Sequence, residues 1–360
     1  MGTRTEVFDM KKKIAVLFGG CSTEYEVSLQ SAYAVICHMD RTKYEPVLIG
    51  LKRTTGQWFW YLGDPDRIAE DRWYDPDHCV PVYVPTDRTA GGVYYQEQSL
   101  WQLLRLDGAL PVLHGKNGED GTVQGALELA GIPVIGCGIL SSALCMDKDR
   151  AHRMAAAWGV RVPESFLIKK PYEEVTIREK AKELGYPIYI KPVRSGSSFG
   201  ITKVRCEDEL LPAIVLAFDH DDTVIAEENI EGREVGCAVM GTDKLLTGKV
   251  DEIELADGFF DYTEKYTLKT SKIHVPARVE EDTARRIQES ALRIYQALGC
   301  SGFARVDQFL TEDGEIYFNE VNTIPGFTAH SRFPNMLKAS GYTFEEIISH
   351  ILEEGLSCRA

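Results

Sequence analysis

The sequence predicts a chain of mixed α/β class, with an N-terminal doubly wound parallel sheet followed by an α+β region of different texture. Three observations support this prediction. A short apolar run, Lys12–Phe18, leads into a glycine turn and then into helical periodicity. Further apolar runs alternate with helical segments as far as residue 135. From about Gly138 onward, hairpins replace this alternation.

The N-terminal region contains predicted strands at 12–18, 45–51, 108–113 and 132–135, and predicted helices at 27–39 and 121–129. The strands are short and largely apolar, which is typical of strands buried on both faces of a parallel sheet. Ligands of such sheets bind beyond the carboxyl ends of the strands. The turn that follows the first strand, Gly19–Thr23, is therefore a place where a ligand is expected.

The region after Gly138 should form two smaller units. The first has a helix at 141–158, a hairpin whose Gly/Ser tip, Arg194–Gly200, separates two strands, and a further strand at 223–228. The second has a glycine-rich aromatic loop at 257–266, a helix at 281–298, a hairpin at 303–321 and a final helix. We therefore expect domains at 11–137, 138–231 and 232–356.

Composition and charge narrow the function. The chain has 360 residues, of which 44% are hydrophobic and 26% charged, and its net charge is −15. An acidic chain argues against nucleic acid or an anionic membrane as a partner. No apolar run approaches the roughly 20 residues that span a bilayer, and the first residues lack the apolar core of a signal peptide. Nine scattered cysteines without a CxxC pair predict reduced thiols, so we expect a cytoplasmic protein.

The hairpin at 303–321 carries the most informative residues. Asp313-Gly314 is a two-residue turn signal. A turn centred there places Asp307 opposite Glu320 and Arg305 opposite Asn322. Because side chains alternate between faces along a strand, all four project from one face.

Two carboxylates and an amide on one face form an all-oxygen set of the kind that Mg²⁺ prefers. Arg305 beside them could stabilise a developing oxyanion or phosphoryl charge. The alternative is a cross-strand salt-bridged surface without a metal.

At this point the residues match a known family. The chain resembles the D-alanine–D-alanine ligases of the ATP-grasp superfamily from Lys12 to about Leu352. Within that family it is most similar to the vancomycin-resistance D-alanine–D-serine ligases of the VanG type. The matching stretches are Gly19–Leu29, Leu113–Gly121, Met146–Lys148, Ile190–Pro192, Gly196–Gly200, Glu264–Tyr266, Arg305–Asp307 and Glu320–Ser331, with the 141–150 and 250–254 runs supporting the subgroup.

The resemblance implies a two-subdomain ATP-grasp fold after the N-terminal domain, and a two-step reaction for peptidoglycan precursors. ATP phosphorylates the carboxylate of D-alanine, and the amine of a second D-amino acid attacks the acyl phosphate. The implied cofactors are ATP and two Mg²⁺ ions, with Mn²⁺ as a substitute, and the implied assembly is a homodimer. We expect D-serine rather than D-alanine as the second substrate, and Tyr266 argues against D-lactate.

The resemblance also assigns residues to the nucleotide. Lys148 and Lys191 should hold the α- and β-phosphates, and the tip with Ser198 should cover them. Lys265 should reach the transferred phosphoryl group from a lid loop. The adenosine should contact backbone groups of Glu227, Glu228 and Ile230 and the carboxylate of Glu234.

The remaining assignments concern the amino acids and the chemistry. Glu24 should pair with the D-alanine ammonium, His114 should contact the reacting carboxylate or acyl phosphate, and Ser197 and Tyr266 should close the site with Glu24. Ser331 and Arg332 should bind the second substrate's carboxylate. Arg305 and the Gly326 N–H should form the oxyanion site, and Asp307, Glu320 and Asn322 the metal site. Asp251 and Glu252 are expected to favour a serine hydroxyl.

Two other classes of protein were weighed against this interpretation. A binding module that kept the fold but lost its chemistry would lack a metal ligand or a phosphate lysine, and the sequence retains all of them. A nicotinamide-dependent oxidoreductase would carry GxGxxG after the first strand, which this chain lacks.

Overall fold

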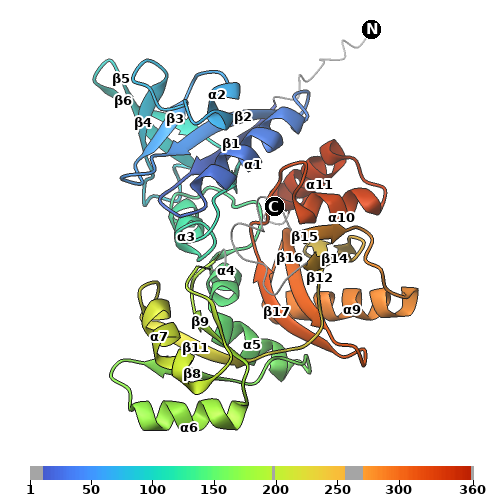
Figure 1. Cartoon of the computed structure of the whole chain (residues 1–360). Helices are drawn as coiled ribbons and strands as arrows, with labels where there is room; N and C mark the ends of the chain where they lie inside the picture. The colour runs from blue at the N-terminus through green and yellow to red at the C-terminus, as the bar shows by residue number, and fades with distance from the viewer. Residues whose placement is uncertain (1–10, 197–198, 256–270, 358–360) are drawn as a thin grey trace.

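The computed structural model describes residues 11–196, 199–255 and 271–357. Three β-sheets follow one another along the chain, each with its own helices (Figure 1). One sheet falls within each of the three predicted segments. The predicted boundaries themselves remain a prediction.

The N-terminal sheet has seven strands in the order β6-β5-β4-β3-β2-β1-β7. Only β2, β1 and β7 are parallel, as predicted, and the other strands add an antiparallel meander. The predicted strand at 132–135 is wrong, because it is reduced to a single bridge between Val134 and Ala109. The strands are β1 (Lys12–Gly19), β2 (Tyr44–Leu51), β3 (Trp58–Tyr61), β4 (Cys79–Tyr83), β5 (Gly92–Glu97), β6 (Leu100–Arg105) and β7 (Gly108–Pro111).

The antiparallel strands escaped prediction because their turn lacks the usual residues. The β5–β6 hairpin turns at Gln98-Ser99, and both residues have positive φ, 46° and 69°. Two-residue hairpin turns of this kind normally carry Asn-Gly or Asp-Gly. No glycine or asparagine marks this turn in the sequence.

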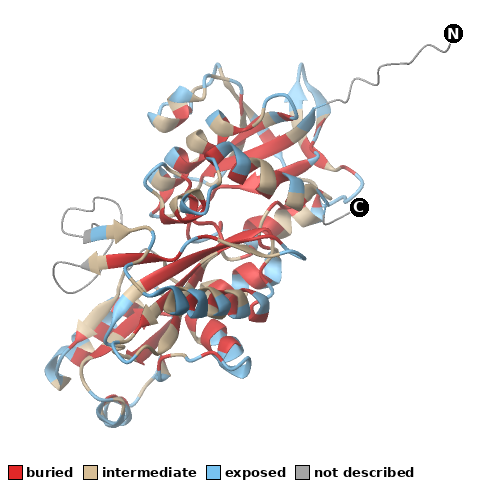
Figure 2. Ribbon diagram, turned by 90° about the vertical axis from the view of Figure 1, so that its right-hand side faces the viewer, coloured by how far each residue is buried: buried red, intermediate tan, exposed pale blue. Residues whose placement is uncertain are grey.

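Helices cover both faces of the N-terminal sheet. Ile14, Val16 and Phe18 of β1 pack with α1 (Tyr25–His38) on one face. Ala15 and Leu17 pack on the other face with α3 (Thr122–Leu129). This two-sided burial confirms the doubly wound arrangement, and Figure 2 shows the strands as buried. The short helix α2 (Asp66–Ala69) lies beside α1.

The central sheet is antiparallel in the order β10-β9-β11-β8, and it confirms the predicted hairpin. Its strands are β8 (Ser165–Lys169), β9 (Ile188–Pro192), β10 (Thr202–Val204) and β11 (Thr223–Glu228). The helices α6 (Glu174–Leu184) and α7 (Glu207–Phe218) form a core with it.

The single helix predicted at 141–158 is wrong, because the chain forms two helices, α4 (Ile139–Met146) and α5 (Lys148–Ala157). Asp147 separates them with extended backbone angles, φ −91° and ψ 100°. Its side chain accepts a hydrogen bond from the backbone N–H of Arg150 at 3.0 Å. Asp147 is thus the N-cap of a new helix, and Lys148 is the first residue of that helix.

The third sheet has the order β15-β14-β12-β16-β17, with β13 paired to β12. Helix α9 packs on it, and α10 and α11 end the chain. The elements are β12 (Arg233–Met240), β13 (Leu246–Thr247), β14 (Asp251–Leu255), β15 (Ser271–His274), α9 (Glu281–Ala297), β16 (Phe303–Leu310), β17 (Ile316–Asn322), α10 (Arg332–Ala339) and α11 (Phe344–Ser357).

The last helix, α11, packs against both the N-terminal and the C-terminal parts of the chain. Ile347 and Ile351 of α11 belong to the same buried cluster as Ile14 and Val16 of β1 and Phe303 of β16. The N-terminal and C-terminal sheets therefore share one hydrophobic core. Within the described residues, no helix is both long and apolar enough to cross a bilayer.

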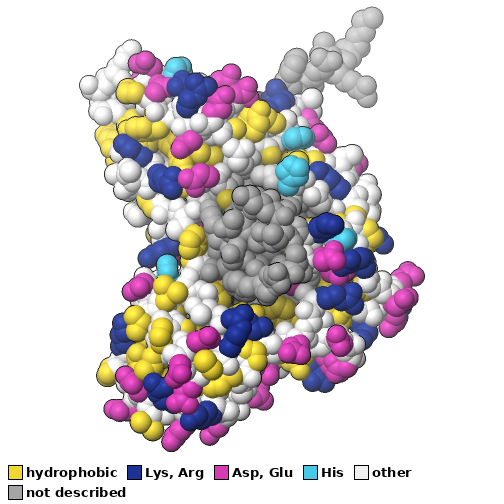
Figure 3. All heavy atoms as spheres, viewed as in Figure 1, with side chains coloured by type: hydrophobic (Ala, Val, Ile, Leu, Met, Phe, Trp, Pro, Cys, Tyr) yellow, Lys and Arg dark blue, Asp and Glu magenta, His cyan; other side chains and the backbone are white. Residues whose placement is uncertain are grey.

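The distribution of charged side chains and the state of the cysteines agree with what the composition predicts. Basic and acidic side chains are interspersed over the face shown in Figure 3. The eight cysteines of the described residues are all free, which confirms the predicted reduced thiols for those eight.

Candidate active site

The carboxylate hairpin has the predicted pairing but not the predicted turn. Asp307 pairs with Glu320 and Arg305 with Asn322. The turn, however, contains three residues, 312–314, because the Thr311 N–H bonds to the Glu315 carbonyl at 3.0 Å. A bulge at Asn319 adds one residue to β17 and restores the pairing nearer the site. Two deviations of one residue thus cancel.

Asp307 lies at the centre of a buried polar cluster. It is 1% exposed. Arg305 donates to it from Nε at 2.9 Å and from Nη2 at 2.7 Å. Asn322 donates from Nδ2 at 3.0 Å, and Arg332 Nη1 lies 3.2 Å away. The four side chains of the hairpin do share a face, as the alternation predicted.

Arg332, which is expected to bind the second substrate's carboxylate, is paired with acidic side chains of the protein. Its Nε and Nη2 donate to the two oxygens of Asp251 at 2.7 and 2.8 Å, and Nη1 donates to Glu234 at 3.2 Å. The guanidinium is buried and paired with three carboxylates. These three carboxylates hold the guanidinium in place, and its contact with a substrate carboxylate stays a prediction.

The same geometry revises two neighbouring expectations. Glu234, expected at the ribose, forms an ion pair with Arg332. Asp251 and Glu252 point to opposite faces of β14, and Glu252 pairs with Arg278 at 2.9 Å. Only Asp251 therefore lies beside Asp307 and Arg332.

Gly236 of β12 forms the floor beneath this cluster. A Cβ atom there would collide with Arg332 Nη2 and lie 2.7 Å from Asp251 Oδ1 and 3.0 Å from Asp307 Oδ1. An added Cβ would therefore force at least one of these buried, paired side chains to move. Nothing in the sequence around Gly236 predicts this crowding.

His114 is held by protein on both ring nitrogens. Nδ1 lies 2.8 Å from the Ile324 carbonyl and must donate to it, while Nε2 lies 3.2 Å from Ser31 Oγ and accepts from it. Burial lowers the pKa of His114, although Glu24 opposes that shift, so the ring is neutral. Both ring nitrogens therefore have protein partners in this structure, and the contact of His114 with the reacting group stays a prediction.

Glu119 lies in the matching stretch Leu113–Gly121, and the resemblance assigns it no role. Its Oε2 accepts from the Gly115 N–H at 2.8 Å, and its Oε1 accepts from the Ile324 N–H at 3.0 Å. Burial of the carboxyl group and the charge of Glu24 raise the pKa of Glu119 to about 8. Its place in a Gly-flanked loop at the end of a parallel strand was the available signal.

Glu24 brings three loops together. It is the N-cap residue of α1 and is 9% exposed. A Cβ atom on Gly115 would lie 2.7 Å from its Oε2, and one on Gly196 would lie 3.1 Å away. Gly115 also has φ +71°, a backbone angle that favours glycine. Both the short distance to Glu24 and this angle therefore favour glycine at position 115. Glu24 thus lies between the loop after β7 and the Gly/Ser tip.

The two predicted phosphate lysines are both buried. Lys148 donates to the Ser195 carbonyl at 2.8 Å. Lys191 forms an ion pair with Glu227. Burial alone would lower the pKa of Lys191, but the charge of Glu227 raises it above its usual value. The same pairing outweighs burial and lowers the pKa of Glu227.

Glu227 keeps one oxygen without a hydrogen-bond donor. Its Oε1 lies 3.7 Å from His152 Nδ1, and neither atom has a hydrogen-bond partner among the described residues. His152 Nε2 lies 2.8 Å from the Asn319 carbonyl and donates to it, so Nδ1 is an acceptor. Two buried acceptors therefore face the same point, where a donor group would fit.

The expected backbone contacts to adenine are only partly available. Glu227 is paired on both sides, with Ser165 and Tyr189, so its backbone belongs to the sheet. The Glu228 N–H and carboxylate bond to the backbone of Glu164. Ile230 lies in the connection between β11 and β12.

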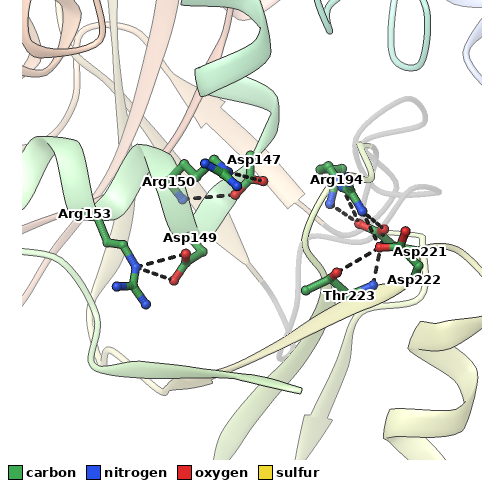
Figure 4. A network of polar contacts seen from close by, with 8 residues as sticks. All are labelled: Asp147, Asp149, Arg150, Arg153, Arg194, Asp221, Asp222 and Thr223. Carbon is green, nitrogen blue, oxygen red and sulfur yellow. Dashed lines mark hydrogen bonds and ion pairs between the residues drawn. The ribbon is translucent and has the colours of Figure 1, made fainter. Parts of the chain in front are cut away.

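The base of the Gly/Ser tip is anchored by charge (Figure 4). Arg194 donates to Asp221 from its backbone N–H at 2.7 Å and from Nη2 at 2.6 Å, and also contacts Asp222. The tip begins at a fixed point on the turn before β11. Four predicted residues, Ser197, Ser198, Lys265 and Tyr266, lie outside the described residues.

Ser331 lies directly against Gly326. A Cβ atom on Gly326 would be 2.7 Å from Ser331 Oγ. That hydroxyl also accepts from the Thr328 N–H at 3.0 Å and lies 2.9 Å from Thr328 Oγ1. Ser331 thus shapes the turn that carries Gly326.

The residues expected to hold the metal supply oxygen donors. In the described parts of the chain, no group of three or more His, Cys, Asp or Glu could hold an ion. Two carboxylates and an amide, Asp307, Glu320 and Asn322, are nevertheless paired on one face. Asn322 donates from its nitrogen to Asp307, so its oxygen is the atom left for a cation.

Three successive sheets, a carboxylate hairpin and two buried lysines near a glycine-rich tip agree with the ATP-grasp ligase class that the sequence predicts. The chain belongs to the D-alanine–D-alanine ligase family. The N-terminal part of that family, "D-ala D-ala ligase N-terminus", matches residues 13–137, and "D-ala D-ala ligase C-terminus" matches residues 156–353.

Individual relatives agree with this assignment. The chain is 41% identical to vancomycin C-type resistance protein VanC2 of Enterococcus casseliflavus, over 95% of this chain and 97% of that protein. It is 40% identical to a D-alanine–D-alanine ligase of Caldicellulosiruptor bescii, over 95% and 94%. The solved VanG D-Ala:D-Ser ligase of Enterococcus faecalis is 55% identical with a TM-score of 0.90, covering 96% of this chain and 100% of that one.

Proposed function

We propose that this enzyme uses ATP and Mg²⁺ to join D-alanine to D-serine through an acyl phosphate. The observation that carries the proposal is the hairpin on which Arg305, Asp307, Glu320 and Asn322 share one face. That face combines oxygen donors for a metal with a cation for developing negative charge. The precursor dipeptide D-alanyl-D-serine belongs to peptidoglycan synthesis of the vancomycin-resistance type.

The nucleotide would lie between the central and C-terminal sheets. Lys148 and Lys191 would hold its phosphates, and the acceptor pair Glu227 Oε1 and His152 Nδ1 suits the exocyclic amino group of adenine. Asp307, Glu320 and Asn322 would hold Mg²⁺, which when bound neutralises phosphate charge. In this proposal Glu227 contacts adenine through its side chain rather than its backbone.

The amino acids would lie at the carboxyl ends of β1 and β7. Glu24 would pair with the D-alanine ammonium and so fix the direction of its carboxylate. That carboxylate would attack the γ-phosphorus with ADP as the leaving group. The amine of the second substrate would then attack the acyl carbon, lose a proton and expel inorganic phosphate to leave the peptide bond. Arg305 and the Gly326 N–H would stabilise the resulting oxyanion. Ser197, Ser198, Lys265 and Tyr266 keep their predicted roles as part of this proposal.

D-Serine is proposed as the second substrate because the chain is similar to VanG, which is a D-Ala:D-Ser ligase. Asp251 is the acceptor that lies beside the hairpin, and it is paired with Arg332. A pocket discriminates a hydroxyl strongly only when it hydrogen-bonds that hydroxyl. D-Alanine is the alternative second substrate, because D-alanine–D-alanine ligases are similar over the same length. We also propose a cytoplasmic homodimer.

The test is ATP-dependent phosphate release with D-alanine alone and then with D-serine added, with products identified by mass. We expect the mixed dipeptide to dominate near neutral pH and chelation of Mg²⁺ to stop turnover. Predominance of D-alanyl-D-alanine would reassign the second substrate, and absence of both dipeptides would refute the ligase.

A further inference from the structure

One buried segment of the C-terminal part is held by the N-terminal part through three backbone groups. Glu119 accepts the Ile324 N–H at 3.0 Å, and His114 Nδ1–H donates to the Ile324 carbonyl at 2.8 Å. Ser31 Oγ accepts the Phe327 N–H at 3.2 Å. The N–H and the carbonyl of Ile324 and the N–H of Phe327 are thus each held by a hydrogen bond. Gly326 lies between these two residues in the chain.

The residues that make these bonds are connected to one another. Ser31 Oγ–H donates to His114 Nε2 at 3.2 Å. Glu119 also accepts the Gly115 N–H at 2.8 Å, which closes the loop that starts at His114. Gly115 in turn lies against the carboxylate of Glu24. The contacts therefore connect the proposed ammonium site at Glu24 directly to the backbone around Gly326.

We propose that Glu119 and Ser31 are positioning residues that hold the Gly326 N–H in register with the first substrate for the peptide-forming step. This inference rests on the proposed function. The N–H of Gly326 is useful only where the oxyanion develops, when the amine attacks the acyl carbon. Phosphorylation of the carboxylate occurs earlier and does not use it. Loss of the positioning contacts should therefore impair the second step more than the first.

The test compares the two steps in the same variants. The first step is followed with ATP carrying ¹⁸O in the β–γ bridge and D-alanine as the only amino acid. Reversible cleavage of the bridge bond moves the label into a non-bridging β position. The second step is followed as dipeptide formation. Glu119→Ala should lower kcat for dipeptide roughly 10- to 100-fold, because small misplacements have large effects on positioned groups. Label movement should stay within roughly 3-fold, because the first step does not use the Gly326 N–H.

Asp120→Ala is the matched control, since Asp120 is a carboxylate of the same loop. Among the residues that the structure describes, it accepts hydrogen bonds from the local N–H groups of Asn117 and Thr122 only. Both steps should stay near wild type in that variant. Ser31→Ala provides a second variant if Glu119→Ala does not fold, and its dipeptide kcat should fall roughly 3- to 10-fold, as expected for one neutral hydrogen bond.

Equal loss of both steps in the Glu119 and Ser31 variants would overturn the inference, as would dipeptide formation at the wild-type rate. A wild-type enzyme that makes neither dipeptide would instead refute the proposed function. The two failures are therefore distinguishable in one set of reactions.

Discussion

At the scale of single residues, the buried ion pair between Lys191 and Glu227 makes the stability of the protein depend on pH. Both groups are almost fully buried. Each stabilises the charge of the other, so the contribution of the pair to stability is present between the unfolded pKa values, about 4.5 and 10.5. It is lost as pH rises through the raised pKa of Lys191 or falls through the lowered pKa of Glu227.

Glu227→Gln should therefore destabilise the protein and weaken nucleotide binding. The change leaves a buried ammonium without its counter-charge, which typically costs about 3–5 kcal/mol. Urea unfolding at pH 7 measures the loss, and the KM for ATP measures the binding. Glu231→Gln, an exposed acid four residues away, is the control and should match wild type. Equal stability of the two variants would contradict the pairing.

The buried His114 should make the stability of the protein depend on pH. Its pKa is lowered in the folded state, so the unfolded chain binds the proton more tightly and folding is favoured as pH rises towards 6.5. Acidification below 6.5 should destabilise the protein, with a limiting slope of about 1.4 kcal/mol per pH unit for this group. Unfolding free energies of wild type and His114→Gln between pH 5 and 7 test this.

The slope should be shallower in the variant. His152 also has a lowered pKa and Glu119 has a raised one, so the comparison of the two proteins isolates His114. Parallel curves would show that His114 takes up its proton equally in both states.

At the scale of elements, strand β12 supports the hairpin from below. Gly236→Ala should displace Arg332, Asp251 or Asp307, because all three crowd the position of the added methyl group. Overpacking of this kind costs about 1–3 kcal/mol. We expect dipeptide turnover to fall at least tenfold, since Asp307 is a proposed metal residue.

The control for Gly236→Ala is the same substitution at another glycine, Gly138. Gly138 has negative φ, −81°, and nothing lies within 4 Å of an added Cβ. Gly138→Ala should change stability by less than about 0.5 kcal/mol. A Gly236→Ala variant that behaves the same way would show that the cluster above β12 can shift without loss.

The hairpin shows how far an element can be predicted from its sequence. Its alternating residues and turn signal placed four side chains on one face, and the structure confirms their pairing. The Asp313-Gly314 signal could not reveal a three-residue turn, nor the bulge at Asn319. That bulge residue offers its carbonyl to His152, a residue distant in the sequence.

At the scale of the whole molecule, helix α11 packs into the core that the N-terminal and C-terminal sheets share, so we expect these two sheets to unfold together. Ile351 is fully buried in the core shared by β1 and β16. Ile351→Ala should destabilise the protein by about 2–5 kcal/mol. Unfolding should be followed by the fluorescence of Trp73, which belongs to the N-terminal core, and by far-ultraviolet circular dichroism. Both signals should show the same lowered unfolding midpoint. Glu345→Ala, an exposed change on the same helix, should keep the wild-type midpoint, and two separate transitions would contradict a shared core.

The sequence by itself determined the parallel strands around β1, the reduced cysteines, the pairing of Asp307 with Glu320 and the family. These depend on local periodicity and on short motifs, which are written in consecutive residues. Only the tertiary structure decided that Arg332 faces Asp251, that His114 and Glu119 hold Ile324, and that three buried side chains crowd Gly236. Each of those contacts joins residues far apart in the chain, and a buried charge or donor takes whichever partner the packing brings to it.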